Sequence, residues 1–574
     1  MKPRISITLL VLSSVFSFVA ALIGFGEVKE NYSIATRVYM ALKLFTFDGG
    51  NISGPIPLGV EIARWLAPAT TLGGIYTAAH AFFSKLWGSL RLRWIRGHTV
   101  ICGGGEKGCA FASELAQESG AQVVLVDLVE SPAIEILRKQ GVLVIQGDGA
   151  DSAIMQEVGL SRASRLVCIT GDDSTNIGIT LAAADSLPAE RASWPLEIHT
   201  HVSDVARRNI LQRSHIMDLK NDLTHRIRLF NCHANRARIV LEECPLEWDP
   251  RTGLRDQEVH LVLGVLGPLE KAMVVQAAHI GHFRHGGKLR VHLVSIRAKS
   301  DESALIKEYP GFRNCANLDF TTLEESDDFV ETVAKAATCW SGNSLITVLL
   351  GGNPEAALAD ALLLGEQLKH GPCLRVLIDA KGNGVIRNIV TKNPNLTSWI
   401  KFLPELTAAV GRNAVFQESL DAVARRIHET WKLGTDQRIL KAESDGDYET
   451  AKKHREKDTY RTWEDLTEEQ KDANRLAADH ISIKFRAADL GPDLGSSLSE
   501  VWDDLDAQQL DMLSRMEHER WAAPLWMAGW TAGERNDELK IHPNLVPYDE
   551  LDEGTRKYDL EQVRMAAAYR VRIK

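Results

Sequence analysis

The pattern of hydrophobic and polar positions divides the chain into a membrane-like start and a long region of short apolar strands. Residues 5–24 form an uncharged run, and a second uncharged run extends over residues 65–84. About 20 consecutive apolar residues allow a helix to cross a bilayer. The pattern therefore predicts an α-helical transmembrane hairpin within residues 1–96, with membrane helices at about 5–24 and 65–84.

Basic residues flank both runs on their outer sides. Lys2 and Arg4 precede the first run, whereas Lys85 and Arg91 follow the second. Because basic flanks favour the cytoplasmic side, both ends of the hairpin are expected in the cytosol. The predicted location is the cell inner membrane, with cytosolic C-terminal domains. A secretory signal peptide is the alternative for the first run, although its apolar part is longer than such peptides usually have.

The segment between the two runs, residues 25–64, is expected to form the outer loop of this hairpin. Its stretch 32–51 is either a re-entrant pore helix or an interfacial amphipathic helix. The stretch contains no sequence like TVGYG, the backbone filter of potassium channels. Potassium selectivity is therefore not expected from it.

Beyond residue 96 the apolar runs become short, and the first of them leads into a glycine cluster. A strand is expected at 98–102 and a helix at 109–119, and a second strand ends at Asp127, 19 residues after Gly108. Such a loop lets phosphate approach the backbone at a helix N-terminus, and an acid at this spacing accepts hydrogen bonds from a ribose. The alternative is a glycine turn that binds nothing. The predicted cofactor is NAD or another adenine nucleotide, bound by Gly103, Gly105, Gly108 and Asp127.

Further apolar strands follow in alternation with helices. They are expected at 142–148, 165–173 and 196–202. The stretches "GDGADSAIMQEVGL" and "ITGDDSTNIGITLAA" resemble the RCK or TrkA-N family, cytosolic nucleotide-binding domains that regulate potassium channels and transporters. The resemblance implies an RCK domain at 97–250, with Asp148 and Asp172 at strand ends that line the binding crevice.

A second strand–helix pattern at residues 257–400 resembles a degenerate RCK-like lobe. Gly264 and Gly267 remain, but Glu270 stands where a third glycine is expected, and no acid ends the second strand. A carboxylate close to the phosphate position would repel the ligand. This lobe is therefore expected to be structural and to serve in domain contacts or dimerisation.

Residues 98–400 contain no recognisable catalytic set, so the protein is not expected to be an enzyme. His199 and His201 alternate along one strand, but no third ligand is near in sequence, so they are interpreted as ordinary strand histidines and no metal site is expected. The net charge of -10 argues against a nucleic-acid partner. The eight cysteines contain no CxxC pair and are interpreted as buried thiols.

The stretch "RMEHERWAAPLWMAGWTAGERNDELKIHPNLVPYDEL" near the C-terminus closely resembles the ryanodine-receptor repeat, or RyR domain. That repeat carries an EH..RW helix, a GW turn and an HP.LVP segment. The resemblance covers residues 419–574. It includes a highly charged insert at about 436–462, which lacks an apolar face and is interpreted as a solvated linker or an exposed helix.

The RyR resemblance implies a second ligand site. An arginine can hold phosphate bidentately, and a tryptophan ring can stack on a base. The alternative is that the tryptophans belong to the core and that Glu517 and Arg520 form a salt bridge across one helical turn. The predicted ligand-binding residues are Arg475, Glu517, Arg520, Trp521 and His542.

The predicted fold class is therefore multidomain, with a transmembrane hairpin, two α/β Rossmann-like lobes and a mostly α-helical RyR module. This layout resembles that of ligand-gated channels, in which cytosolic domains that sense nucleotide-type ligands act on a pore, and it also suits a defence effector. A non-conducting membrane-anchored nucleotide sensor and an NAD(P)-dependent enzyme are the alternatives. The expected partners are the lipid membrane, small nucleotide-type ligands and further copies of the chain in a homo-oligomer.

Overall fold

The computed structural model divides the chain into two compact units, Met1–Arg96 and Gly97–Lys574. Each unit has its own core. The residues that the structure describes are 7–28, 32–49, 52, 54–188, 194–213, 224–249, 251, 258–284, 289–340, 344–369, 373–490, 502 and 504–570.

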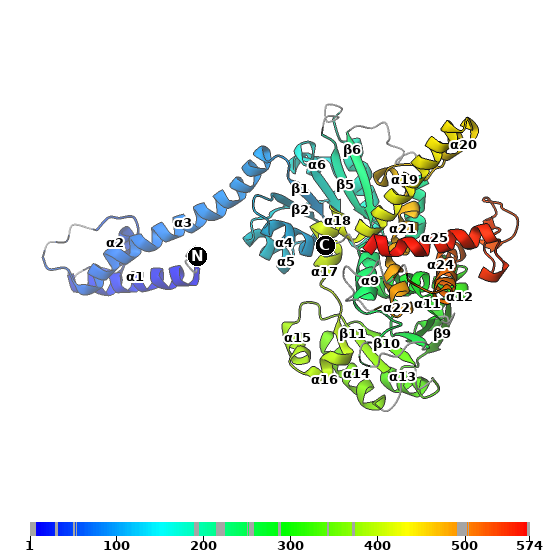
Figure 1. Ribbon diagram of the computed structural model, residues 1–574. Helices are drawn as coiled ribbons and strands as arrows, with labels where there is room; N and C mark the ends of the chain where they lie inside the picture. Colours follow the sequence, from blue (N-terminus) through cyan, green and yellow to red (C-terminus); the bar gives the residue numbers. More distant parts are fainter. Residues whose placement is uncertain are drawn as a thin grey trace. The chain divides into compact units, whose positions relative to one another are not determined.

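The first unit consists of three helices, α1 (Ile7–Val28), α2 (Ile34–Leu44) and α3 (Leu58–Trp94), drawn in blue in Figure 1. Helices α1 and α3 lie against each other at two glycines. A Cβ on Gly24 would come within 2.7 Å of Val60. Small residues of this kind allow the close backbone approach that membrane helices use.

One helix of the described residues, Thr8–Val28, is long and apolar enough to cross a membrane. This agrees with the predicted first membrane helix. The second predicted span, 65–84, lies inside α3, which does not reach the same hydropathy over its described residues. Helix α2 lies in the stretch between the two spans, and its Ala41 and Leu44 are buried in the small core of this unit.

The second unit begins with a six-stranded parallel sheet. Its strand order is β3-β2-β1-β4-β5-β6. Strands β2 and β3 are therefore added on one side of β1, and β4, β5 and β6 on the other side, so the strand order reverses between β1 and β4. The central strands are buried except for Arg165 at the start of β4, which is why they are nearly continuous apolar runs. The strands are β1 (Thr99–Cys102), β2 (Val123–Asp127), β3 (Leu143–Gln146), β4 (Arg165–Cys168), β5 (Leu196–His201) and β6 (His225–Phe230). The helices are α4 (Glu106–Gln117), α5 (Pro132–Lys139), α6 (Ser152–Glu157), α7 (Asp173–Asp185), α8 (Val205–Arg213) and α9 (Cys232–Glu243).

A second six-stranded parallel sheet repeats this arrangement. Its order, β12-β11-β10-β7-β8-β9, is the same Rossmann-like order written from the other edge. The prediction of a second α/β lobe is confirmed. The strands are β7 (Val259–Leu263), β8 (Leu289–Ser295), β9 (Ala316–Thr322), β10 (Leu345–Leu350), β11 (Cys373–Ile378) and β12 (Ile400–Phe402). The helices are α10 (Pro268–Ile280), α11 (Ala298–Glu308), α12 (Phe312–Cys315), α13 (Phe329–Ala337), α14 (Pro354–Gln367), α15 (Gly384–Thr391), α16 (Pro394–Trp399), α17 (Leu406–Val410) and α18 (Arg412–Val415).

The C-terminal module is mostly helical. Capping boxes start two of its helices, with Thr467 and Gln470 at α21 and Asp506 and Gln509 at α24. The elements are α19 (Ala422–Ser444), α20 (Tyr448–Arg455), α21 (Glu468–Asp479), α22 (Ile481–Ala487), α24 (Ala507–Met527), β13 (Thr531–Ala532), β14 (Ile541–His542) and α25 (Glu553–Arg570).

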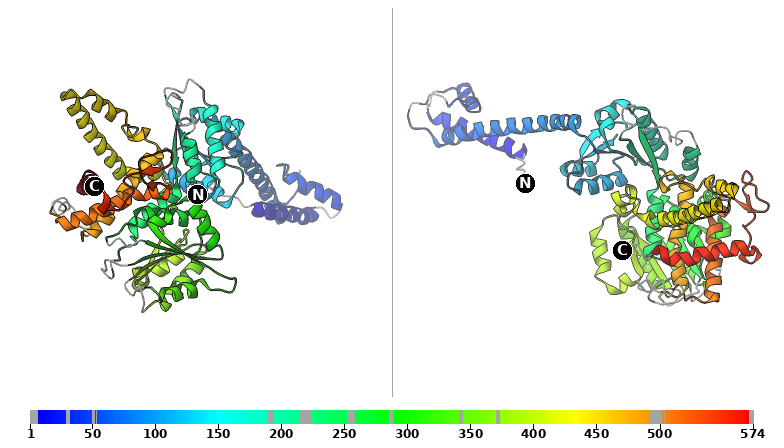
Figure 2. Two further views of the ribbon diagram at one scale, coloured as in Figure 1. Left: turned by 90° about the vertical axis from the view of Figure 1, so that its right-hand side faces the viewer. Right: turned by 45° about the horizontal axis from the view of Figure 1, so that its top comes forward.

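The charged insert, 436–462, is helical over most of its length. The end of α19 and all of α20 form an arm, yellow in Figure 2, that projects from the module. The expectation that this insert lacks an apolar face is wrong. Ile439, Ala442 and Ala451 are buried together, with Tyr460 packed against them, so the two helices hold each other through a small apolar contact.

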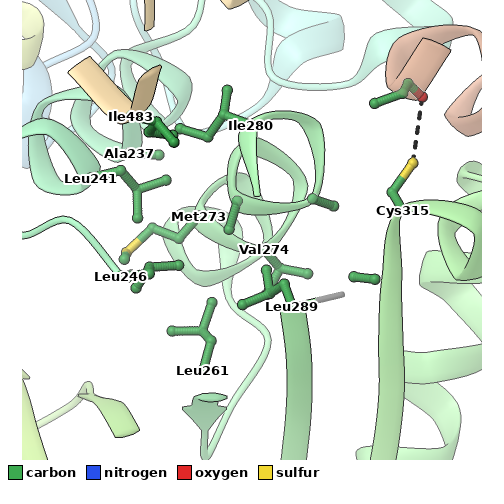
Figure 3. Packing of buried hydrophobic residues seen from close by; sticks show 14 of the residues in the cluster. Ala237, Leu241, Leu246, Leu261, Met273, Val274, Ile280, Leu289, Cys315 and Ile483 are labelled. Carbon is green, nitrogen blue, oxygen red and sulfur yellow. Dashed lines mark hydrogen bonds between the residues drawn. The ribbon is translucent and has the colours of Figure 1, made fainter. Parts of the chain in front are cut away.

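The module and the second lobe share one hydrophobic core. Figure 3 shows Leu241 of α9, Met273 of α10 and Ile483 of α22 in this cluster. The Cys315 thiol, at the end of α12, donates a hydrogen bond to the Ala523 carbonyl of α24 at 3.6 Å. Helix α9 therefore begins at the carboxyl edge of the first sheet and ends in the core of the second lobe.

Candidate ligand-binding sites

The glycine loop lies between β1 and α4, at the point where the strand order of the first sheet reverses. Gly103 has φ +118°, and a Cβ there would lie 2.7 Å from the Ile169 carbonyl oxygen. A Cβ on Gly108 would overlap the Gly103 carbonyl oxygen. By contrast, a Cβ on Gly105, the N-cap of α4, would meet nothing within 4 Å. The space before the helix N-terminus is therefore open, as a phosphate requires.

Asp127 ends β2 beside this loop. Its carboxylate accepts hydrogen bonds from the Gly104 N–H and, at 2.8 Å, from the Val129 N–H. A carboxylate offers about four acceptor positions. Two acceptor positions are therefore not used by these hydrogen bonds.

Asp148 and Asp172 are exposed after the carboxyl ends of two other strands of this sheet, β3 and β4. Asp148 accepts a hydrogen bond from the Ala150 N–H at 2.9 Å. Asp172 is the N-cap of α7, and hydrogen bonds from Thr175 lower the pKa of its carboxyl. The structure thus places both acids at the same sheet edge as the glycine loop, each with one carboxylate oxygen engaged in a local turn.

At the N-terminus of α10, the corresponding helix of the second lobe, a side chain fills this space. A Cβ on Gly267, the N-cap of α10, would lie 2.6 Å from a Glu270 carboxylate oxygen, and one on Gly351 would lie 3.2 Å from the other. Burial raises the pKa of Glu270 above its usual range. Nearby, Arg236 of α9 binds the Asp379 carboxylate at 2.9 and 3.0 Å. Protein carboxylates occupy the place that phosphate takes in a nucleotide-binding lobe.

The two strand histidines have different surroundings. The ring of His199 lies against Phe416, with centroids 4.9 Å apart, and burial lowers the pKa of His199 to about 3. His201 lies instead beside Cys232, with 3.0 Å between its Nε2 and the thiol sulfur, and His233 is next to them. Sequence reasoning missed Cys232 and His233 because it did not predict β6, the strand that delivers them. A Cys–His pair directly after a strand was the available signal.

The C-terminal module contains a cavity of about 500 Å³. Four of the five predicted ligand residues, Glu517, Arg520, Trp521 and His542, line it. They come from α24 and β14, and the opposite wall comes from α19, α21 and α25. The other lining residues are Ile427, Trp431, Ala473, Asn474, Ala477, His518, Asn544, Asp552, Gly554, Thr555, Tyr558, Asp559 and Gln562.

The fifth predicted residue, Arg475, does not line this cavity. Its guanidinium group is bound by Asp421 at 2.7 Å, Glu468 at 2.7 Å and Asp472 at 2.8 Å. These carboxylates hold the pKa of Arg475 well above its usual value although burial opposes this. The neighbouring residue on α21, Asn474, lines the cavity instead.

The acids around Arg475 also bind arginines of the first lobe. Arg238 of α9 contacts Asp421 and Asp479, each at 2.7 Å. Arg208 of α8 contacts Asp472 at 2.8 Å. A cluster of largely buried ion pairs therefore joins the RCK-like lobe to the C-terminal module.

A buried ion pair lies at the base of the cavity. Glu517 pairs with both Arg520 and Lys484, and all three are nearly inaccessible to solvent. Burial alone would raise the pKa of Glu517, but the two cations hold it well below its usual range. The alternative salt bridge between Glu517 and Arg520 therefore exists, and it forms part of the cavity wall. The remaining charged lining groups are the carboxyls of Asp552 and Asp559.

Aromatic rings form one wall of the cavity. Trp521 stacks on His518, with centroids 5.6 Å apart, and meets His542 edge-on at 5.2 Å. His518 is fixed by the Val546 carbonyl oxygen, 2.9 Å from its Nε2. The cavity thus offers a large ring for stacking, together with more carboxylates than cations.

Comparison with known proteins identifies two domains in the chain. The model of the TrkA-N domain matches residues 99–219, and that of the RyR domain matches residues 503–569. An uncharacterized protein of Methanothermus fervidus is 28% identical over 97 residues, which cover 16% of this chain and only 15% of that protein.

Among solved structures, the chain is similar to GsuK bound to ADP, with 14% identity and a TM-score of 0.38 over 72% of this chain and 97% of that chain. It is also similar to the GsuK channel bound to NAD, with 13% identity and a TM-score of 0.38 over 72% of this chain and 83% of that chain.

Proposed function

We propose that the protein is a membrane-anchored sensor of nucleotide-type ligands that gates a membrane pore. The observation that carries the proposal is the open space at Gly105, at the N-terminus of α4 and beside Asp127. It supports binding of NAD or another adenine nucleotide, with phosphate at the helix N-terminus and ribose at Asp127.

The cavity of the C-terminal module binds the second ligand. Arg520 is already paired with Glu517, and Asp552 and Asp559 add further carboxylates to the lining. An isolated phosphate would be repelled by these acids. The site is better suited to a nucleobase, which stacks on Trp521 and donates its N–H groups to carboxylates.

The chain connection supports the membrane part of the proposal. Helix α3 ends at Trp94 and β1 begins at Thr99, so few residues separate the membrane segment from the first sheet. In the proposal, α1 and residues 65–84 of α3 span the inner membrane as a hairpin, several copies assemble, and the cytosolic domains act on α3. No catalytic step is included, so bound NAD should be recovered unchanged.

Ion flux into liposomes that contain the full-length protein tests this function. Flux should rise when ADP or NAD is added on the side of the cytosolic domains. Gly105→Val should remove the response by filling the phosphate space. Trp521→Ala should remove the response to the second ligand while ADP still binds, and circular dichroism should show that the variant is folded. Flux that is the same with and without every nucleotide tested, in a protein that binds ADP, would exclude gating by this site.

A non-conducting sensor is the second candidate, and a specific observation favours it. Among the described residues, only α1 meets the length and hydropathy expected of a membrane span. Cysteine labelling distinguishes a transmembrane hairpin from a single span. The hairpin places Gly49→Cys and Ser444→Cys on opposite sides of the membrane. A single span or a surface anchor would place both labels on the same side. Gly49 is the position of choice because Asn51, in the same loop, lies outside the described residues.

A further inference from the structure

Three side chains that commonly bind metal ions meet at the carboxyl edge of the first sheet. His201 ends β5, whereas Cys232 and His233 begin α9 directly after β6. Because β5 and β6 are parallel neighbours, their carboxyl ends bring these residues together. Among the residues that the structure describes, this is the one group of three such side chains with all ligand atoms within 4.8 Å of one another.

We propose that His201, Cys232 and His233 bind a divalent transition-metal ion such as Zn²⁺. Imidazole nitrogen and thiolate sulfur are the ligands that this class of ion prefers over carboxylate oxygen. Three protein ligands leave one tetrahedral position for water or for an oxygen of a bound ligand.

The orientation of His201 supports this site. Its Nε2 faces the Cys232 sulfur at 3.0 Å, and its Nδ1 faces the Asp173 carboxylate at 3.8 Å. That Nδ1 is buried and has no hydrogen-bond partner. A carboxylate behind a metal-binding imidazole commonly fixes the ring and its tautomer. Asp173 is held in place by hydrogen bonds from the N–H groups of Ser203 and Asp204, at 2.9 and 2.8 Å.

Burial raises the pKa of the Cys232 thiol to about 11, so the thiol keeps its proton until a metal ion binds. Its sulfur lies in the first turn of α9, where the helix dipole favours negative charge and the Asn231 side chain accepts hydrogen bonds from the His233 and Ala234 N–H groups. Metal binding would replace the thiol proton, which is released to solvent. The charges of Lys107 and Arg236 oppose a cation here, whereas the Asp173 carboxylate favours one.

A thiol–imidazole hydrogen bond inside an ordinary core is the simpler explanation of the contact between His201 and Cys232. It does not account for His233, a half-buried third ligand within reach of both. The metal site explains all three positions together.

Cobalt titration of the full-length, detergent-purified and chelator-treated protein tests the site, because Co²⁺ bound to thiolate gives a charge-transfer absorption. One equivalent of Co²⁺ should bind with this absorption, and Zn²⁺ should displace it. Cys232→Ser should remove the absorption, and His233→Ala should weaken Co²⁺ binding by at least about tenfold. Cys168→Ala is the matched control, since Cys168 is a buried thiol of β4 in the same sheet.

Absence of stoichiometric Co²⁺ binding would overturn the site. So would a thiolate absorption that survives in Cys232→Ser, because it would come from another cysteine, such as the exposed Cys339. If Cys232→Ser does not fold by circular dichroism, His233→Ala decides the question, since His233 is half-buried at the start of its helix. Unchanged Co²⁺ affinity in folded His233→Ala protein would also overturn the site.

Discussion

The two α/β lobes have the same strand order but different crevices. In the first lobe the N-terminus of α4 faces open space at Gly105, and Asp127 is held beside it. In the second lobe the corresponding helix, α10, faces the carboxylate of its own Glu270. Strand order therefore creates the place for a nucleotide, and a few side chains decide whether that place stays open.

The second crevice also contains an internal ion pair. Arg236 binds Asp379 with two hydrogen bonds and donates two more to the Pro404 carbonyl oxygen. Since Arg236 belongs to α9, which starts at the edge of the first sheet, the filled crevice ties the two lobes together. An arginine that fills the second crevice thus also connects the two lobes.

Breaking that ion pair should have the largest effect. Arg236→Ala should lower the free energy of unfolding by about 3 kcal/mol, because it leaves the half-buried Asp379 carboxylate unpaired. Thermal unfolding of the detergent-purified chain measures this change. Arg138→Ala in the first lobe is the matched control, since its partner Glu130 is exposed and the loss should stay within about 1 kcal/mol. Equal losses would mean that the second crevice has no special structural role.

Valine at the two N-cap glycines should separate the lobes by ligand binding. Gly105→Val should weaken ADP binding by about 100-fold, or about 2.7 kcal/mol, because its side chain fills the phosphate space. Gly267→Val should leave ADP affinity unchanged and lower the melting temperature, because its side chain meets Glu270. Isothermal titration calorimetry and thermal unfolding measure the two effects. Normal ADP binding by Gly105→Val would show that the glycines form only a turn.

Asp127 should contribute less than the glycine loop. Asp127→Ala should weaken ADP or NAD binding by about 1–3 kcal/mol, the cost of an unpaired polar partner. Asp127→Asn keeps an acceptor oxygen for the Gly104 N–H and should retain part of the affinity. An affinity for ADP equal to that of the unchanged protein in both variants would remove Asp127 from the site.

The smallest effect is expected at Glu270, and it depends on pH. Burial raises the pKa of Glu270, so the ionised carboxylate disfavours the folded state, and its contribution to stability falls as pH rises through that raised pKa. Glu270→Gln should therefore melt at a higher temperature than the unchanged protein at pH 7. The difference should disappear below about pH 3, where the carboxyl is protonated in both states. A difference that does not change with pH would contradict this assignment.

The sequence predicts the central strands of both sheets but misses β6, β9 and β12. These three are edge strands. An edge strand packs against fewer neighbours, so polar residues are tolerated along it, as in "HRIRLF" and "ANLDFTT". A pattern based on buried apolar runs does not detect such strands, and the contacts that they bring about, including that of Cys232 with His201, stay hidden.

The C-terminal cavity shows a similar limit. The sequence identifies the side chains of α24 that line it, because they share one short motif. It does not distinguish Asn474 from Arg475, which are adjacent on α21. Successive residues of a helix point about 100° apart, so only the position of the whole helix decides that Asn474 faces the cavity and Arg475 faces Asp421.

The ion cluster of Arg208, Arg238 and Arg475 has a consequence for the way the cytosolic unit unfolds. Detaching the C-terminal module would leave buried arginines on the first lobe and buried carboxylates on α21 without partners, and each unpaired charge is costly. The module also shares its hydrophobic core with the second lobe. Residues 97–574 should therefore open as one cooperative block in hydrogen exchange, with the amides of α9 and α21 protected to the same degree.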